Sequence, residues 1–557
     1  MDIRRLTDTL SISPQISPVD LATLAGLGFR SIVCHRPDGE AADQPTFREI
    51  EQAAAACGIV ARHQPVVSGK VEDAQALAFG QLMDELPKPV LAFCRTGTRS
   101  ATLWALSQAG QRPLPQLLDS ARQAGVDLGG VVRRLANGGR TPPDTADARH
   151  AVVIVGGGAA GIAVASSLLA RQPDLDIAVI DPAAVHYYQP GWTLVGAGIF
   201  APGQTARTLA SVLPRGVHWI QAAVAAFEPA QQAVILDGCR IVRYEQLVVC
   251  PGLQLDWGAI PGLADTLGRH GVTSNYRYDL APHTWQQVQA LARRGGGRAL
   301  FTQPPMPIKC AGAPQKAMYL SADAWRRAGV LDRVDIQFCS AGPVLFGVPA
   351  YVPALMTYVE RYGIGLNFGE TLVAVDGPAH RATFRKSHPD GRSTLEEREF
   401  DLLHAVPPQR APDVVRVSPL ADANGWVEVD PATLRHPRHE NVWALGDVAG
   451  TTNAKTAAAA RKQAPVVAHN LLAARGAARG EARYDGYGSC PLTVERGRIV
   501  LAEFTYGGAL APSFPRWLID GTQPSRLAWW LKERVLPPLY WQGMLKGREW
   551  LAEPETV

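Results

Sequence analysis

Two cysteines and one group of glycines stand in surroundings that suit redox and nucleotide chemistry. Cys310 lies in a proline-containing loop beside Lys309, whose charge would favour the reactive thiolate. Cys94 ends an apolar run and precedes a glycine-containing loop and a predicted helix, so backbone N–H groups and the helix dipole would surround its sulfur. The glycines follow a third apolar run, at positions 156, 158 and 161. These residue types predict thiol redox chemistry coupled to a bound nucleotide.

The glycines form a dinucleotide-binding fingerprint. Gly156 permits a tight turn, Gly158 lets the backbone approach a pyrophosphate, and Gly161 lets the next helix pack on its strand. Asp181 follows Gly161 by twenty residues and ends another apolar run, where a ribose-binding carboxylate belongs. The predicted first half of a cofactor site consists of Gly156, Gly158, Ala159, Ala160, Gly161 and Asp181.

Two later segments resemble motifs of the flavoproteins that carry two dinucleotide-type domains. Residues 441–447 end in Gly446-Asp447 and resemble the late FAD motif, in which the Asp binds the ribityl chain. Residues 244–252 resemble the middle motif, with Cys-Pro-Gly, ending in Gly252, where Ala-Thr-Gly is usual. Three motifs in this order imply FAD as the cofactor.

A second glycine fingerprint, which NAD(P)H-dependent members of that superfamily carry, is missing. The strand predicted at 298–302 continues into 303–314, which contains four prolines and Cys310 but no GxGxxG. Prolines lack the N–H donors that a phosphate cradle needs. The sequence therefore argues against nicotinamide binding and against an NADH:quinone dehydrogenase.

The order of apolar runs predicts an α/β fold. Runs at 151–155, 177–180, 246–250, 299–302 and 334–338 alternate with helical stretches, as in parallel sheets. We predict a phosphatase-like α/β domain at 1–137 and a linker at 138–149. A disulfide-reductase-like flavoprotein with two Rossmann-like parts follows at 150–483, with FAD parts at 150–280 and 405–483 and a second part at 281–404. An amphipathic tail at 484–557 ends the chain.

Composition narrows the class of protein. The 557 residues carry a net charge of only +4, which gives no reason to expect nucleic acid. The eight cysteines include no CxxC pair and no Cys/His cluster with zinc spacing, so we predict no metal site and a reducing compartment. The start of the chain lacks the apolar core of a signal peptide, and no apolar stretch is long enough to span a membrane. We expect a cytoplasmic protein.

The cysteine loop gives a specific resemblance. Residues 307–320, PIKCAGAPQKAMYL, resemble the redox-cysteine loop of sulfide:quinone oxidoreductases, especially the mitochondrial-type subgroup. Residues 186–198, 453–456 and 484–492 are similar to that subgroup too. The resemblance implies that sulfide attacks an oxidised enzyme sulfur and that electrons pass through FAD to a quinone. Sulfane sulfur then leaves on an acceptor such as glutathione, sulfite or sulfide. It also implies Cys310 as the catalytic sulfur, Lys455 near the flavin and Gln189 in the cofactor site.

One position departs from the family pattern. Many members read Gly-Asp-Cys at the late FAD motif, and that cysteine partners the loop cysteine, whereas this chain has Val448. Three alternatives stay open. Cys339, at the end of a predicted strand, could replace the missing second cysteine, external thiols could do the resolving step, or the electron donor is not sulfide. Other candidate functions are a different flavin-dependent quinone or cytochrome reductase, and a non-catalytic FAD-bound sulfide or redox sensor.

The N-terminal loop has its own chemistry. Four residues separate Cys94 from Arg99, the CxxGxR spacing of rhodanese-type sulfurtransferases, whereas tyrosine phosphatases have five. The domain resembles small phosphatase-like proteins described as sulfur transferases, and Arg99 would bind an anion. The spacing favours a persulfide on Cys94. A phosphatase hydrolase with Asp38 as general acid is the second alternative, and an inactive anion pocket the third.

The C-terminal segment mixes aromatics with Lys and Arg, which suits a bilayer interface. With the family resemblance, this predicts a monotopic peripheral protein on the inner face of the membrane. Its partners would be sulfide, a sulfur acceptor and a quinone, with Phe346 and Tyr351 as candidates for the quinone slot. A tail that caps the protein or forms a homodimer contact is the alternative.

Overall fold

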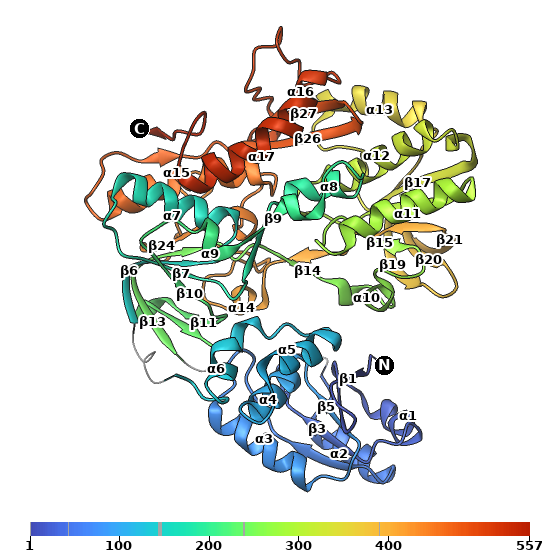
Figure 1. Cartoon of the computed structure of the whole chain (residues 1–557), viewed down its shortest axis with the longest axis vertical. Helices are drawn as coiled ribbons and strands as arrows, with labels where there is room; N and C mark the ends of the chain where they lie inside the picture. Colours follow the sequence, from blue (N-terminus) through green and yellow to red (C-terminus); the bar gives the residue numbers. More distant parts are fainter. Residues whose placement is uncertain (1, 43, 143–147, 238–239, 389, 557) are drawn as a thin grey trace. The chain divides into compact units, whose positions relative to one another are not determined.

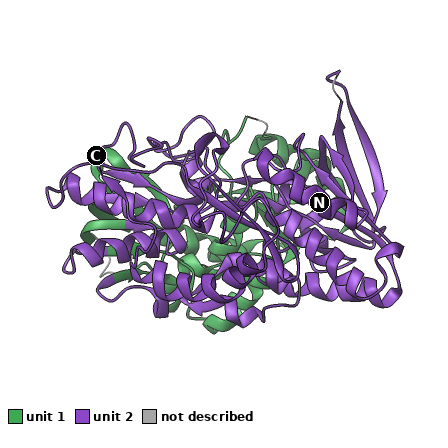
Figure 2. Ribbon diagram, turned by 90° about the horizontal axis from the view of Figure 1, so that it is seen from above, with its two compact units in different colours: residues 1–153, 178–184, 218–245 green, residues 154–177, 185–217, 246–557 purple. Residues whose placement is uncertain are grey.

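The computed structural model describes residues 2–42, 44–142, 148–237, 240–388 and 390–556. The chain forms two compact units (Figure 2). Unit 1 comprises residues 1–153, 178–184 and 218–245, and unit 2 comprises 154–177, 185–217 and 246–557. Part of the predicted linker, 143–147, lies outside the described residues, and the predicted domain borders stay a prediction.

The N-terminal part of unit 1 is a five-stranded sheet in the order β1-β2-β5-β3-β4 (Figure 1). Its strands are β1 (Arg4–Arg5), β2 (Leu10–Ser13), β3 (Ser31–Cys34), β4 (Val60–His63) and β5 (Val90–Phe93). Its helices include α2 (Phe47–Ala56), α3 (Asp73–Glu85), α4 (Thr98–Gln108) and α5 (Leu114–Gln123). Successive strand residues point to opposite faces, so Leu91 and Phe93 enter one core while Val90 and Ala92 enter the other.

A seven-stranded sheet in the order β10-β7-β6-β13-β12-β11, with β24 beside β13, carries the glycine fingerprint. These strands are β6 (Ala148–Val155), β7 (Ile177–Ile180), β10 (Val217–Ile220), β11 (Val224–Glu228), β12 (Ala233–Leu236), β13 (Ile241–Val249) and β24 (Val442–Ala444). Helix α7 (Ala159–Arg171) follows the fingerprint, and α15 (Ala457–Ala474) packs against α7. The predicted α/β fold is confirmed.

A second parallel sheet, β15-β22-β16-β17-β18, forms the other Rossmann-like part. Its strands are β15 (Val272–Thr273), β16 (Gly297–Gln303), β17 (Val334–Ser340), β18 (Gly365–Phe368) and β22 (Leu402–His404). Helices α11 (Leu280–Arg294), α12 (Ala313–Arg327) and α13 (Val352–Arg361) lie in the same core as one sheet face, and the antiparallel strands β19 (Glu370–Asp376), β20 (Arg381–Ser387) and β21 (Ser393–Glu399) lie beyond the other.

Much of the C-terminal segment packs into the protein core, whereas an amphipathic tail would lie on the surface. The hairpin of β26 (Gly488–Glu495) and β27 (Arg498–Phe504) packs on α12. Tyr540 and Trp541, predicted at a bilayer interface, are buried. The Tyr540 hydroxyl lies 2.7 Å from His186 Nε2, and its ring packs on Tyr188. The prediction is therefore wrong for these two aromatics, because a buried polar partner and ring contacts fix them in the protein.

Other aromatics of this segment are exposed, including Trp517, Trp530 and Trp550. Among the helices that the structure describes, none has the length and apolar character needed to cross a bilayer.

Candidate active site

Two sulfurs meet where β16, α12 and β26 come together. The Sγ atoms of Cys310 and Cys490 lie 3.3 Å apart, unbonded, and Cys490 is 2 % exposed. A disulfide needs about 2 Å, so a small movement joins them. Sequence reasoning placed Cys490 in a family-like segment but missed its role. Its only sequence signal was its position within residues 484–492.

Lysine charges surround this pair. Lys316, in the first turn of α12, donates from Nζ to Cys310 Sγ at 3.2 Å and is 4 % exposed. The hydrogen bond with Cys490 and the charge of Lys316 hold the pKa of Cys310 well below its usual range, against the opposing effect of burial. The same contact with Cys310, together with burial, raises the pKa of Cys490. Cys310 is therefore the thiolate of the pair and Cys490 the thiol.

Lys532 is a second buried lysine near the sulfur pair. Its Nζ donates to the Pro491 carbonyl oxygen at 3.3 Å. Burial and the charge of Lys316 lower the pKa of Lys532 to about 7, while the two cysteine sulfurs oppose that shift. Both lysines were missed, because neither the helix nor the tail showed which way their side chains point.

Cys339 is not the second sulfur. It is fully buried on β17, where its Sγ accepts a hydrogen bond from Arg398 at 3.1 Å, and burial raises its pKa to about 12. Its neighbour Phe338 faces the core that contains Cys490, so Cys339 points to the opposite sheet face. The sulfur beside Cys310 comes from β26 instead.

The glycine fingerprint has the shape that a dinucleotide requires. Gly156 has φ +109°, and a Cβ there would lie 2.3 Å from the Cys250 carbonyl oxygen. A Cβ on Gly161 would lie 1.8 Å from the Gly156 oxygen. A Cβ on Gly158 would meet nothing within 4 Å, and Gly158 is the N-cap of α7. Two glycines thus close the turn while the third leaves open space at a helix N-terminus, which fits a pyrophosphate.

The structure also brings the later motifs to this turn. Gly446 has φ +75°, and its Cβ position lies 3.0 Å from the Cβ of Ala160 on α7. Cys250, at the middle motif that ends in Gly252, contacts Gly156. Asp181 directly follows β7, and its Oδ1 accepts from the Ala183 N–H at 2.8 Å. Its predicted ribose contact stays a prediction.

Buried charges lie beside the late motif. Lys455 is 5 % exposed and donates from Nζ to the backbone oxygens of Asp447 and Ala449 at 2.6 and 3.0 Å. Burial lowers the pKa of Lys455 to about 8, against the charge of Asp447. Burial raises the pKa of Asp447, while Lys455 and Lys309 oppose that shift. The predicted Lys455 and Asp447 therefore form one electrostatic unit.

Lys309 joins this unit to the cysteine loop. It forms an isolated parallel bridge with Lys455, and its Nζ donates to Gln189 Oε1 at 2.9 Å. The Tyr276 hydroxyl donates to the Lys309 carbonyl oxygen at 3.2 Å. Cys310 thus follows directly after the residue that links the predicted Gln189 and Lys455.

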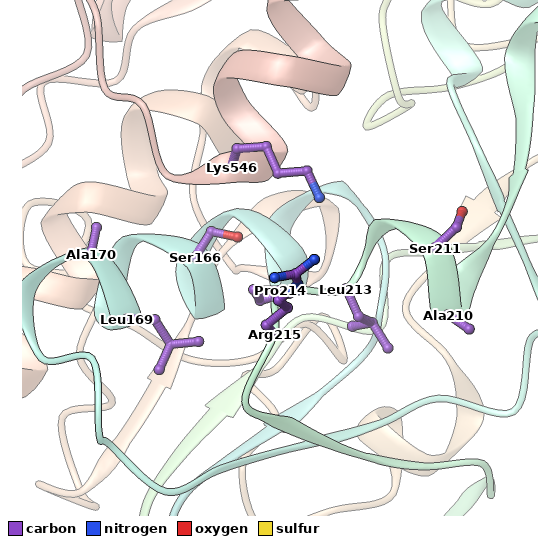
Figure 3. A pocket seen from close by; sticks show the side chains of 9 residues that line it. All are labelled: Ser166, Leu169, Ala170, Ala210, Ser211, Leu213, Pro214, Arg215 and Lys546. Carbon is purple, nitrogen blue, oxygen red and sulfur yellow. The ribbon is translucent and has the colours of Figure 1, made fainter.

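A separate cavity of about 610 Å³ opens beside α7 (Figure 3). It is lined by Ser166, Leu169, Ala170, Ala210, Ser211, Leu213, Pro214, Arg215 and Lys546. None of these is a predicted site residue, and the sulfur pair does not line it.

The N-terminal loop surrounds the Cys94 sulfur. The Gly97 N–H donates to Cys94 Sγ at 3.1 Å. The buried Arg99 guanidinium donates to the Val66 carbonyl oxygen at 2.7 Å and to Glu40 at 2.8 Å. Glu40 also accepts from Arg36 at 2.7 Å. Burial would raise the pKa of Glu40, but the bonds from Arg99 and Arg36 outweigh it and lower that pKa.

Asp38 lies exposed at the start of α2, where its Oδ1 accepts from the Phe47 N–H at 2.8 Å. One carboxylate oxygen is therefore used as a helix cap. Its role as general acid stays a prediction.

Known proteins resemble both parts of the chain. Residues 2–111 match the family described as beta-lactamase hydrolase-like protein, phosphatase-like domain, and residues 150–298 match pyridine nucleotide-disulphide oxidoreductase. The mitochondrial sulfide:quinone oxidoreductase of Dictyostelium discoideum is 40 % identical over 399 residues, covering 71 % of this chain and 86 % of the relative. The beta-lactamase hydrolase-like protein of Agrobacterium fabrum is 35 % identical over 133 residues, 24 % of this chain and 31 % of that protein.

Among solved structures, the sulfide:quinone oxidoreductase from Aquifex aeolicus superposes with a TM-score of 0.60 at 18 % identity. The superposition covers 72 % of this chain and 92 % of the Aquifex aeolicus chain, and it supports the fold.

The glycine geometry gives a matched pair of variants. We expect Gly158→Ala to fold normally, because its Cβ meets open space, but to bind FAD at least roughly tenfold more weakly by entering the pyrophosphate site. Gly156→Ala should instead lose stability even without FAD, because its Cβ strikes the Cys250 carbonyl oxygen. Flavin titration and thermal unfolding of the apoprotein measure both effects. Wild-type FAD affinity in Gly158→Ala would contradict the assignment.

Lys316 should control the Cys310 thiolate. Its removal in Lys316→Met raises the pKa of Cys310, so the pH profile of Cys310 alkylation should move up by roughly one to three pH units. Lys316→Arg keeps the charge and should restore the profile, and the exposed Lys546→Met should leave it unchanged. Peptide mass spectrometry after iodoacetamide treatment of the reduced protein reads the profile. An unmoved profile in Lys316→Met shows that the lysine does not stabilise the thiolate.

Proposed function

Since the chain belongs to the sulfide:quinone oxidoreductase family, we propose that the Cys310–Cys490 pair is where it oxidises sulfide. The 3.3 Å separation of the two sulfurs, with Lys316 on Cys310, carries this assignment. FAD is the cofactor, and a quinone takes the electrons. Val448 then needs no replacement near the late motif, because the second sulfur comes from β26.

The lysine decides the direction of attack. In the oxidised pair, the better leaving group is the sulfur whose thiolate is stabilised, and that is Cys310. Hydrosulfide therefore attacks Cys490 Sγ, the S–S bond breaks, and the products are a Cys490 persulfide and a Cys310 thiolate. A nucleophilic acceptor takes the outer sulfur and leaves Cys490 as a thiolate. The two thiolates then give up two electrons as their disulfide re-forms.

When bound, FAD would be the two-electron acceptor that links the thiols to the quinone. The residues of unit 2 that would hold it are the fingerprint from Gly156 to Gly161, Gly252, Gly446 and Asp447, together with Gln189 and Lys455. The ribose contact of Asp181 stays a prediction. Lys455 and Lys309 place positive charge beside the cysteine loop, which favours a cofactor that gains negative charge.

An anionic sulfur acceptor suits the sulfur pair. Lys316 balances the thiolate, and the buried Lys532, whose pKa of about 7 leaves it about half protonated near neutral pH, would become fully charged beside a second anion. A thiolate or sulfite acceptor would supply that anion, whereas a neutral acceptor would not.

Membrane contact and quinone access belong to the C-terminal half. Phe346 and Tyr351 are buried in the core cluster that also contains Cys490, and their place in a quinone slot stays a prediction. Exposed Trp517 and Trp530 support a peripheral contact with the bilayer. A position on the inner, cytoplasmic face stays a prediction.

We assign sulfane-sulfur transfer to the N-terminal loop. The Cys94 thiolate attacks the outer sulfur of a small persulfide. The S–S bond of that persulfide breaks, the rest of the molecule leaves as a thiolate, and a Cys94 persulfide forms. The Gly97 N–H, which donates to Cys94 Sγ, would stabilise such a sulfur. The phosphatase-like family match keeps phosphoester hydrolysis as the second candidate.

The sulfur pair can be tested directly. We expect Cys310→Ser and Cys490→Ser each to abolish sulfide-dependent quinone reduction, because each removes one sulfur of the pair. Cys339→Ser should keep FAD and most of the activity, since that sulfur faces another core. Anaerobic loss of flavin absorbance on adding sulfide, then recovery on adding a soluble quinone, measures both half-reactions. Full activity in Cys490→Ser would overturn this assignment.

The N-terminal assignment has a separate test. After incubation with glutathione persulfide, mass spectrometry should find added sulfur on Cys94 in the wild type and none in Cys94→Ser. Arg99→Gln should reduce the loading, and Cys57→Ser is the matched control in the same unit. Hydrolysis of p-nitrophenyl phosphate without persulfide loading would favour the phosphatase alternative instead.

A further inference from the structure

The turn of the β26–β27 hairpin and the start of α16 (Arg526–Trp530) line an open surface cavity of about 410 Å³. Its lining residues are Glu495, Arg496, Gly497, Arg498, Arg526 and Trp529. Arg496 and Arg526 are exposed, and among the described residues neither forms an ion pair. Two guanidinium groups at this cavity therefore have no carboxylate to neutralise them.

The surroundings of the cavity are also positive. Arg326, Arg327 and Arg361 lie around it, and with Arg498 they share the carboxylates of Asp323 and Glu495. Together with Arg496 and Arg526, the six arginines exceed these two carboxylates by four positive charges. Asp323 is held by Arg326 and Arg327 at 2.8 and 3.0 Å. Glu495 accepts from the Tyr358 hydroxyl at 3.0 Å and pairs with Arg498 at 3.2 Å. Both acids are thus engaged by the protein itself.

Exposed apolar side chains continue from this cavity along the same segment. Leu527 and Trp530 lie on α16 beside Arg526, with 41 % and 54 % exposure, and Trp517 in the preceding loop is 84 % exposed. Buried neighbours hold these residues in place, because Ile519, Ala528 and Trp529 pack on Ile499 and Leu501 of β27. Figure 1 shows α16 lying beside the hairpin. Arginines next to exposed tryptophans match a bilayer interface with anionic lipid.

We propose that the cavity lined by Arg496, Arg498 and Arg526 binds phosphate groups of anionic phospholipids while Trp517 and Trp530 enter the bilayer interface. The inference rests on the proposed quinone reduction, since a lipid-soluble quinone is met at the membrane. A free anion would use the arginines alone, whereas a bilayer uses the arginines and the tryptophans together. The combination favours the membrane surface.

The test is co-sedimentation of the FAD-loaded protein with vesicles of phosphatidylcholine alone or mixed with phosphatidylglycerol. The double variant R496Q/R526Q should lose affinity for the mixed vesicles, roughly fivefold for each arginine, and keep its affinity for phosphatidylcholine alone. The control R293Q/R385Q removes the same charge from two exposed arginines elsewhere in unit 2 and should bind like the wild type. The variant W517S/W530S should bind both kinds of vesicle less tightly.

Three outcomes would overturn the inference. Equal losses in the two arginine variants would show a general charge effect and no site. Binding of inorganic phosphate to the cavity, with unchanged vesicle affinity in R496Q/R526Q, would show a free-anion site. Failure of the wild type to bind any vesicle would overturn the membrane contact as well, and sulfide-dependent reduction of a soluble quinone then shows whether the proposed function stands without it.

Discussion

The contact between Lys316 and Cys310 is the interaction on which the site depends. A buried ammonium is destabilising unless an anion lies beside it, and a buried thiolate needs a cation for the same reason. Each group therefore keeps the other charged in a place where neither would stay charged alone. Lys532 has no such anion of its own, so burial and the charge of Lys316 lower its pKa to about 7 and leave it about half protonated near neutral pH. A second anion, either the Cys490 persulfide or an incoming acceptor, would hold it fully charged.

This contact requires an unusual local backbone. Cys310 has φ +81°, a left-handed conformation that is unfavourable by roughly 1 kcal/mol or more for a residue with a Cβ. Two residues later, a Cβ on Gly312 would lie 2.7 Å from Cys490 Sγ and 2.2 Å from Leu492 Cδ2. Only glycine lets the start of α12 approach β26 this closely. The packing of α12 against the hairpin thus offsets the strain at Cys310 and sets the distance between the two sulfurs.

The sequence was sufficient where a motif contains its own geometry. The glycine fingerprint, the run after it and Gly446-Asp447 predicted the nucleotide-binding turn, because glycine positions within one strand–turn–helix unit report local backbone shape. The second sulfur could not be predicted in the same way. Cys490 is 180 residues from Cys310, and only the packing of a C-terminal hairpin on α12 brings it close. Cys339 was a candidate for the second sulfur because it ends a predicted strand. The strand pattern does not show which face of the sheet carries the redox cysteines. Tyr540 and Trp541 are residue types common at a bilayer interface, yet contacts with the buried His186 and Tyr188 place them inside the protein.

Charge also separates the two chemistries open to the N-terminal loop. The guanidinium groups of Arg36 and Arg99 share one carboxylate, Glu40, so this cluster carries a single net positive charge. A phosphomonoester near neutral pH carries between one and two negative charges, more than this cluster balances. A persulfide thiolate carries one charge and matches the cluster. Arg99 is already oriented by Glu40 and by the Val66 carbonyl oxygen, so binding a monoanion requires no rearrangement of the arginine. The Arg36–Glu40–Arg99 cluster therefore suits a monoanion such as a persulfide thiolate, in line with the short spacing between Cys94 and Arg99.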